Sequence, residues 1–185
     1  MKKIINDLIK FSPSRSYDNR GYFEETYNKI KCSEQGIEVE FVQDNYSMSI
    51  EAGTIRGLHF QVPPFDQGKL VRCGRGAIYD VALDIRKGSP TYGKWEGHEL
   101  TAENGDQIYI PSGFAHGFIT LKPKSEIIYK CTNFYDFNSE GSIRWDDPDI
   151  AINWPIIKEP IISNKDAKAP LFSSLKSPFI YSMHL

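Results

Sequence analysis

The stretch 54–72 carries the residues best suited to chemistry in this chain of 185 residues. It reads TIRGLHFQVPPFDQGKLVR and sets one histidine, His59, and three cations, Arg56, Lys69 and Arg72, among apolar side chains. Burying a charge costs free energy unless the charge is paired, so a purely structural strand pair has little use for these residues. We therefore expect a hairpin around the Pro-Pro turn that lines a site, with His59 as a base and the cations near an anionic ligand.

A second pattern lies further along the chain. The spacing Gly105-x5-Pro111-x-Gly113-x2-His116 matches the second motif of the cupin barrels, with Thr120 where an Asn is usual. The first cupin motif binds metal through an H-x-H pair, because histidines and carboxylates are the ligands that such a metal requires. The chain has four histidines, His59, His98, His116 and His184. No two of them are two apart, so we expect a cupin-type jelly roll that holds no metal, rather than a metal-dependent cupin oxygenase.

The elements that must position these residues are short and rich in β signals. Residues 77–86 alternate strictly, which predicts a strand with one apolar and one largely polar face. Asp80 and Asp84 fall on the polar face, where they can pair with Lys69 or Arg72 or meet solvent. Further strands are expected at 1–11, 41–49, 95–100, 107–110, 117–120 and 126–132, and a short helix at 28–36. Together they predict a mainly β, antiparallel jelly-roll barrel of the cupin type with short peripheral helices.

Two further features of the chain complete this expected architecture. The tail from Asp136 has little periodicity, but it carries Trp145 and Trp154 and should pack over the barrel. In the strand at 126–132, alternation places Tyr129 on one face with Ile127 and Cys131.

Composition narrows the class of protein. Hydrophobic residues make up 40% of the chain, enough for the core of one domain over residues 1–185. A net charge of -2 argues against a nucleic-acid binder that neutralises phosphates over a broad face. The cysteines Cys32, Cys73 and Cys131 fit neither a disulfide framework nor a zinc site. The apolar N-terminal run is broken by polar residues, and no stretch reaches the roughly 20 apolar residues of a membrane span. We therefore expect a cytoplasmic protein.

A series of segments in order along the chain resembles one known family. They are DNRGYFEETY (18–27), FVQDNYSMS (41–49), IRGLHFQ (55–61), QGKLVR (67–72), DVALDIRKGSPTYGKW (80–95), IPSGFAHGF (110–118), YKCTNFY (129–135) and IRWDDPDIAINWP (143–155). From about residue 15 to 170 the chain is similar to the dTDP-4-dehydrorhamnose 3,5-epimerases. The resemblance implies a homodimer, no cofactor, and a nucleotide-diphosphate 4-keto-6-deoxysugar as substrate, in L-rhamnose biosynthesis.

The same resemblance assigns catalytic roles to individual residues. The ketone of such a substrate acidifies the protons on C3 and C5, so inversion needs a base, an enolate stabiliser and a proton donor on the other face. The resemblance implies that His59 is the base and Asp166 its partner carboxylate. It implies that Lys69 stabilises the enolate and Tyr129 donates the proton, with Tyr135 as the alternative donor.

The resemblance also implies a set of substrate-binding residues. They are Arg20, Phe23, Glu25, Gln43, Asn45, Arg56, His116, Tyr135, Glu140 and Lys165. Guanidinium groups such as that of Arg56 bind phosphate oxygens bidentately. Strict alternation, however, puts Arg56 and His59 on opposite faces of their strand. A bulge at Gly57, or a position of Arg56 at the strand end, would bring both to one site.

Two other functions remain open at this point. A sibling enzyme that inverts only C3 or only C5 of a related nucleotide-sugar would carry the same residues. A non-catalytic sugar-binding jelly roll would keep the pocket without the reaction. The nucleotide base, expected to be dTDP, and the exact sugar do not follow from the residues.

Overall fold

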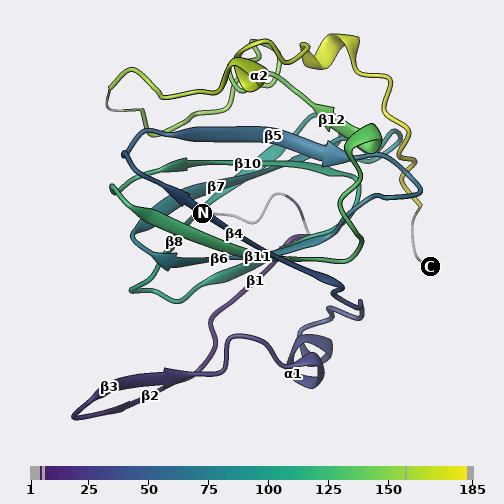
Figure 1. Ribbon diagram of the computed structural model, residues 1–185. Coiled ribbons are helices and arrows are strands. Elements are labelled where there is room, and N and C mark those ends of the chain that lie inside the picture. The colour runs from purple at the N-terminus through teal and green to yellow at the C-terminus, as the bar shows by residue number, and fades with distance from the viewer. Residues whose placement is uncertain (1–4, 6, 157, 183–185) are drawn as a thin grey trace.

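Two five-stranded antiparallel sheets face each other in the computed structural model, which describes residues 5, 7–156 and 158–182 (Figure 1). The first sheet has the order β1 (Ile9–Phe11), β9 (Gln107–Ile110), β6 (Lys69–Arg75), β11 (Ser125–Cys131) and β4 (Gln43–Ser49). The second has the order β12 (Glu140–Ser142), β5 (Ile55–Gln61), β10 (Phe114–Thr120), β7 (Ala77–Asp84) and β8 (Trp95–Thr101). This arrangement confirms the prediction of a mainly β, antiparallel jelly roll.

The expected hairpin over 54–72 is wrong. β5 pairs with β10 and β12 in one sheet, whereas β6 pairs with β9 and β11 in the other. The connection between them crosses from sheet to sheet, and Gln61 anchors it by donating to the carbonyl oxygens of Phe65 (2.5 Å) and Phe134 (3.1 Å). Alternation within a strand says which residues share a face but not which strand lies alongside it. His59 and Lys69 therefore reach one cavity from facing sheets.

The space between the two sheets holds one apolar core. Val71, Ile78, Ala82 and Ile127 are among its buried members. A second core lies on the outer face of β5, β7 and β10, where Val81 and other side chains pack beneath the C-terminal tail. β7 thus buries both of its faces and ends at Asp84, which corrects the expected ten-residue strand with a polar face.

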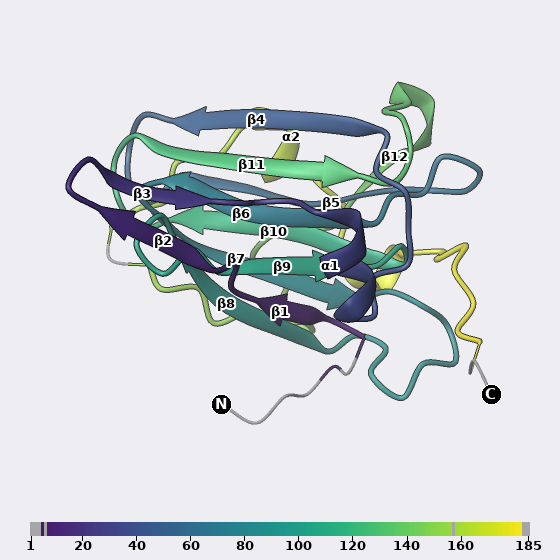
Figure 2. The same cartoon turned by 90° about the horizontal axis from the view of Figure 1, so that it is seen from below.

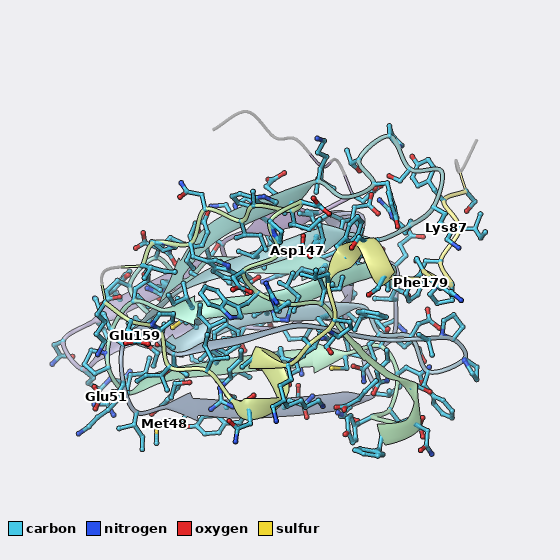
Figure 3. The ribbon with its side chains drawn as sticks, turned by 90° about the horizontal axis from the view of Figure 1, so that it is seen from above. Met48, Glu51, Lys87, Asp147, Glu159 and Phe179 are labelled. Atoms are coloured by element: carbon cyan, nitrogen blue, oxygen red, sulfur yellow. The ribbon has the colours of Figure 1, made fainter. Side chains whose placement is uncertain are left out.

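The C-terminal tail forms this covering layer, as the sequence predicted. It includes η1 (Phe137–Ser139), the short helix α2 (Asn164–Ala167) and η2 (Phe172–Ser174), and it runs over β5 in Figure 1. Trp95 donates its indole N–H to the carbonyl of Ile150 at 3.1 Å. Asp147, which lies beside η2 in Figure 3, accepts the backbone N–H groups of Ile150 (3.0 Å) and Phe172 (2.7 Å). These bonds fix the tail and with it the position of α2.

The N-terminal part first adds β1 to the first sheet and then forms a ribbon outside the barrel. Strand β1 covers only the end of the expected 1–11 strand, of which residues 1–4 and 6 lie outside the described residues. β2 (Arg15–Asp18) and β3 (Gly21–Glu24) form a separate ribbon on the outer side of the first sheet, next to α1 (Lys29–Glu34) (Figure 2). The side chain of Asn28 caps this predicted helix by accepting the N–H of Ile30 at 3.0 Å.

Candidate active site

A cavity of about 470 Å³ lies between the two sheets beneath α2. A second cavity, of about 280 Å³, adjoins it. Four side chains line both of them: His59, Lys69, Tyr129 and Lys165. Volumes of this order suit a ligand of drug or nucleotide size, so the pair of cavities forms the candidate site.

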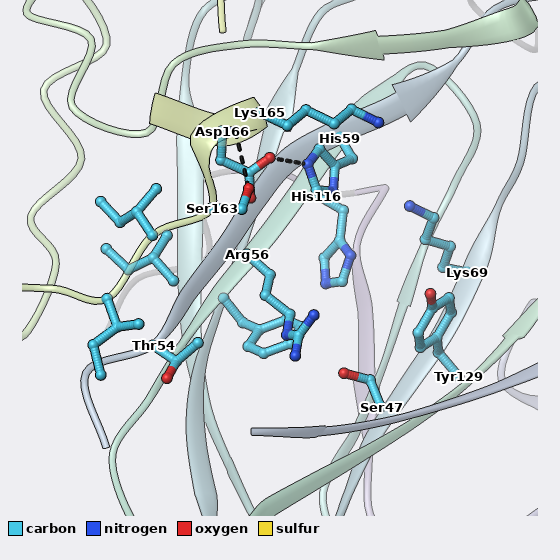
Figure 4. A pocket seen from close by; sticks show the side chains of 14 residues that line it. Ser47, Thr54, Arg56, His59, Lys69, His116, Tyr129, Ser163, Lys165 and Asp166 are labelled. Carbon is cyan, nitrogen blue, oxygen red and sulfur yellow. Dashed lines mark hydrogen bonds and ion pairs between the residues drawn. The ribbon is translucent and has the colours of Figure 1, made fainter. Parts of the chain in front are cut away.

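The structure brings His59 and Asp166 together from elements far apart in sequence. His59 Nε2 lies 2.6 Å from Asp166 Oδ1 (Figure 4). Asp166 is held in place by α2, where its N–H donates to the capping Ser163 hydroxyl at 3.1 Å, and its Oδ2 accepts the N–H of Gly57 at 3.3 Å. Burial alone would raise the pKa of Asp166, but the bond and charge of His59 and the bonds of Gly57 and Ser163 outweigh it and lower that pKa. The carboxylate is therefore ionised and orients the imidazole.

A bulge at Gly57 resolves the positions of Arg56 and His59. Arg56 pairs with Phe118 and His59 with His116, so β5 carries one extra residue between them and both side chains line the larger cavity. Gly57 has a φ of +123°, and a Cβ there would lie 2.6 Å from the Cα of Gly117. Only glycine fits this position. The bulge alternative is thereby confirmed.

Lys69 and Tyr129 form the opposite wall, on neighbouring strands of the first sheet (Figure 4). Burial raises the pKa of Tyr129, so the phenol keeps its proton at neutral pH. Burial lowers the pKa of Lys69, while the charges of Cys131 and Asp80 act in the opposite direction. The predicted facing of Tyr129 is confirmed: it packs against the core that contains Ile127.

His116, the cupin-motif histidine, lines the same cavity and is bound from behind. Its Nε2 lies 2.7 Å from Oδ2 of Asp80, and the two residues are 6% and 1% exposed. Among the described residues Asp80 therefore forms no direct ion pair with Lys69 or Arg72, the expected partners, although its charge acts on Lys69. Asp84 pairs with Arg86 at 2.7 Å. Arg72, expected among the cations of the site, lines neither of the two cavities.

Five of the predicted substrate-binding residues line the smaller cavity. Tyr135 donates its hydroxyl to Glu140 Oε1 at 3.0 Å, and Lys165 forms an ion pair with the other carboxylate oxygen. The side chain of Gln43 accepts the N–H of Tyr135 at 2.8 Å and donates to Asn45 at 3.1 Å. These five residues from β4, β12, α2 and the segment after β11 form one connected network.

Three predicted binding residues do not reach the cavities. Arg20 lies at the tip of the β2–β3 ribbon and pairs with Asp18 at 2.6 Å. Phe23 is 74% exposed on β3, and Glu25 pairs with Lys31 at 2.8 Å. Within a single chain these side chains belong to the outer ribbon. The sequence did not predict this separation, because nothing local to residues 18–27 tells how far the ribbon stands from the barrel.

The sequence reasoning also missed several lining residues. They are Ser47, Thr54, Ile55, Phe118, Ile161, Ile162 and Ser163 in the larger cavity, and Phe60, Gln61, Gln67 and Gly141 in the smaller one. Ser47 was detectable, because period two from Gln43 and Asn45 places it on the same face of β4. Its buried hydroxyl has no hydrogen-bond partner among the residues that the structure describes. Ile161 and Ile162 come from the aperiodic tail and gave no such signal.

Comparison with known proteins identifies the family. A sequence model of the dTDP-4-dehydrorhamnose 3,5-epimerases matches residues 2–174. The chain belongs to this family. It is 51% identical over 172 residues to the dTDP-4-dehydrorhamnose 3,5-epimerase of Salmonella typhimurium, covering 92% of this chain and 93% of that one. It is 50% identical over 177 residues to that of Sinorhizobium fredii, covering 96% and 91%.

A solved structure of the family is similar over almost the whole fold. The dTDP-6-deoxy-D-glucose-3,5-epimerase of Legionella pneumophila, in complex with dTDP-4-keto-L-rhamnose, is 43% identical and superposes with a TM-score of 0.93. The match covers 97% of this chain and 96% of that one. The resemblance drawn from the sequence is confirmed.

In the described parts of the epimerase chain, no group of three or more His, Cys, Asp or Glu side chains is arranged to hold a metal ion. No helix there has the length and apolarity to cross a membrane.

Proposed function

We propose that this chain epimerises C3 and C5 of dTDP-linked 4-keto-6-deoxyglucose, the step of L-rhamnose biosynthesis for which its relatives are named. One observation carries the proposal. The His59–Asp166 pair and Tyr129 enter one cavity from facing sheets, with Lys69 beside Tyr129. Inversion through an enolate requires a base on one side, a proton donor on the other and a cation near the enolate oxygen.

The reaction follows from these positions. His59, oriented by ionised Asp166, removes the proton from the carbon next to the ketone, and the electron pair moves to the ketone oxygen to give an enolate. The Lys69 ammonium stabilises that oxygen. Tyr129 then gives its proton to the opposite face of the same carbon, and protons redistribute through solvent before the second centre reacts. Neither a metal nor a cofactor is needed in this scheme.

Binding of the nucleotide is proposed for the cations and polar groups around the chemistry. Arg56 and Lys165 suit the diphosphate, because both line the larger cavity as cations. His116 faces the sugar from the cavity wall. The network of Gln43, Asn45, Tyr135 and Glu140 at the mouth of the smaller cavity suits the nucleoside, with the Tyr135 ring able to stack on a base.

We also propose a homodimer, in which Arg20, Phe23 and Glu25 of one copy serve the pocket of the other. β4 is the last strand of its sheet, and Tyr46, Met48 and Ile50 on and beside it are exposed. An apolar edge strand invites a partner. Sedimentation velocity would report the dimer mass. Mixing an Arg20→Ala chain with a His59→Ala chain should restore part of the activity that each lacks, and a monomer of full activity would contradict the proposal.

A cytoplasmic location is proposed as well. Cys32, Cys73 and Cys131 are all unpaired and buried. Disulfides are rare in the reducing cytosol and common in secreted proteins, so three free thiols suit the former compartment.

Proton NMR in deuterium oxide tests the reaction. The enzyme is mixed with dTDP-4-keto-6-deoxyglucose, and the C3 and C5 proton signals are followed over time. We expect both signals to disappear as solvent deuterium enters, with conversion to the L-sugar. Deuterium at one carbon only would replace the proposal by a single-centre epimerase. Binding without exchange at either carbon would indicate a sugar-binding protein.

A further inference from the structure

Asp80 is a buried carboxylate whose bonding is incomplete. It lies in the middle of β7, is 1% exposed, and gives one oxygen, Oδ2, to His116 Nε2 at 2.7 Å. The other oxygen, Oδ1, is buried and has no hydrogen-bond partner among the described residues. Native proteins seldom leave a buried polar atom unpaired, because it forfeits its solvation without compensation. Because its partner His116 lines the larger cavity, this incompletely bonded carboxylate lies one residue behind the candidate site and calls for an electrostatic explanation.

Lys69 supplies that explanation from the facing sheet. No described residue forms an ion pair or hydrogen bond with its ammonium group. The titratable groups around it are His59 and Arg56 from β5, His116 from β10, Tyr129 and Cys131 from β11, and Lys165 from α2. Of the two groups whose negative charge acts on Lys69, Cys131 has a pKa raised by burial and stays a neutral thiol. The other is Asp80, whose hydrogen-bonded partner His116 lines the same cavity as Lys69.

We propose that Asp80 is a positioning residue that acts on the epimerase reaction through both Lys69 and His116. Its charge keeps Lys69 in the ammonium form that the enolate oxygen requires. Its bond to Nε2 fixes the His116 tautomer and leaves Nδ1 as the ring nitrogen that can meet the sugar. This inference rests on the proposed function, because it assigns Asp80 a part in stabilising the same enolate.

The variant Asp80→Asn separates charge from shape. Asn keeps the size of the side chain, and its amide oxygen can still accept from His116 Nε2, but the countercharge is gone. Burial then lowers the pKa of Lys69 unopposed, so the alkaline limb of the kcat–pH profile should move to lower pH. A displacement of one pH unit corresponds to about a tenfold loss of kcat on that limb. KM should change by less than about threefold, because Asp80 does not contact the substrate.

Asp166→Asn is the matched control, since it makes the same substitution at the carboxylate of the other histidine. It should lower kcat while leaving the alkaline limb in place, because Asp166 acts on His59. An Asp80→Asn enzyme whose alkaline limb coincides with that of wild type would overturn the inference. So would a loss of kcat that is equal at every pH.

Two measurements on the protein without substrate make the test independent of activity. Long-range 1H–15N NMR of the imidazoles, assigned with His116→Gln, should show His116 with a protonated Nε2 in wild type, and an Nδ1–H neutral tautomer would contradict the inference. 13C NMR of protein labelled at lysine Cε, assigned with Lys69→Met, should show Lys69 titrating at lower pH in Asp80→Asn. If wild type shows no epimerisation, the proposed function fails while these two results still decide the role of Asp80.

Discussion

Two histidines line the larger cavity, and each is paired with an aspartate. The two pairs differ in how far solvent and substrate can reach them. In the His59–Asp166 pair the side chains are 40% and 5% exposed, whereas in the His116–Asp80 pair they are 7% and 0% exposed. The two N···O distances are almost equal, 2.6 and 2.7 Å. Hydrogen-bond length therefore does not distinguish the pairs, but accessibility does. A base must reach its proton, so only the open pair suits proton removal.

The carboxylates differ as well. Asp166 receives bonds from His59, Gly57 and Ser163 and is positioned by the C-terminal tail. Asp80 is bonded only to His116, and its other carboxylate oxygen is buried without a hydrogen-bond partner among the described residues. The same two residue types thus serve different ends because their surroundings differ. In the proposed mechanism the fully bonded pair orients the base, and the incompletely bonded pair supplies charge.

Of the variants considered, His59→Ala should lower kcat the most. If the open pair is the base, this variant should lose about 10³- to 10⁴-fold in kcat. Binding of dTDP, measured by calorimetry, should change little, because the cavity keeps Arg56 and Lys165. His98→Asn is the matched control, since His98 lines neither cavity, and its kcat should stay within about twofold of wild type. Retention of most of the activity in His59→Ala would assign the base elsewhere.

Asp166→Asn should have the next largest effect, a loss of roughly 10²-fold in kcat, because the amide no longer stabilises the imidazolium. Its stability effect depends on pH. The folded pKa of Asp166 is lowered, so its stabilisation is present at neutral pH and disappears as pH falls through that folded pKa.

Urea unfolding at several pH values measures this second effect. The wild type should be more stable than Asp166→Asn by about 1–2 kcal/mol at pH 7, and the difference should shrink in acid. A difference that grows as the pH falls would contradict the sign assigned to the Asp166 pKa.

Gly57→Ala tests the close contact between β5 and β10, the strands that carry His59 and His116. Gly57 donates to Asp166, and its Cα faces Gly117, the neighbour of His116. A methyl group there meets Gly117 backbone at 2.6 Å and imposes a positive φ on Ala, so we expect about 2–4 kcal/mol of destabilisation. Gly88→Ala is the control, because Gly88 has a φ of +82° but nothing within 4 Å. It should lose about 1 kcal/mol in thermal or urea unfolding. Equal losses would show that the contact with Gly117 is unimportant.

Much of the fold could be predicted because strand faces are a local property. The alternation around Tyr129 correctly placed it with Ile127 against the core, and the turn signals located β9 at its observed bounds. The mismatch between Arg56 and His59 left two alternatives, a bulge at Gly57 or a position of Arg56 at the strand end, and the structure shows the bulge. In each case the reason lies within a few residues, in the two-residue period of a strand or in the freedom of glycine.

The candidate site was predicted less evenly. The residue types for a base, a cation and a donor were readable, but their assignment to His59, Lys69 and Tyr129 depended on the resemblance to a family. Asp166 lies in a polar tail with no periodic signal, and it meets His59 only because the tail folds across β5. Asp80 was expected to pair with Lys69 or Arg72, but it bonds to His116, which lies diagonally across from it on β10.

The sequence by itself determined which side chains share a face, where strands end and which residues carry chemistry. The tertiary structure alone decided that β5 and β6 lie in facing sheets, that Asp80 meets His116, and that Arg20 stands outside its own cavity. The physical reason is that faces follow from neighbouring residues, whereas strand partners follow from burying apolar surface across the whole chain.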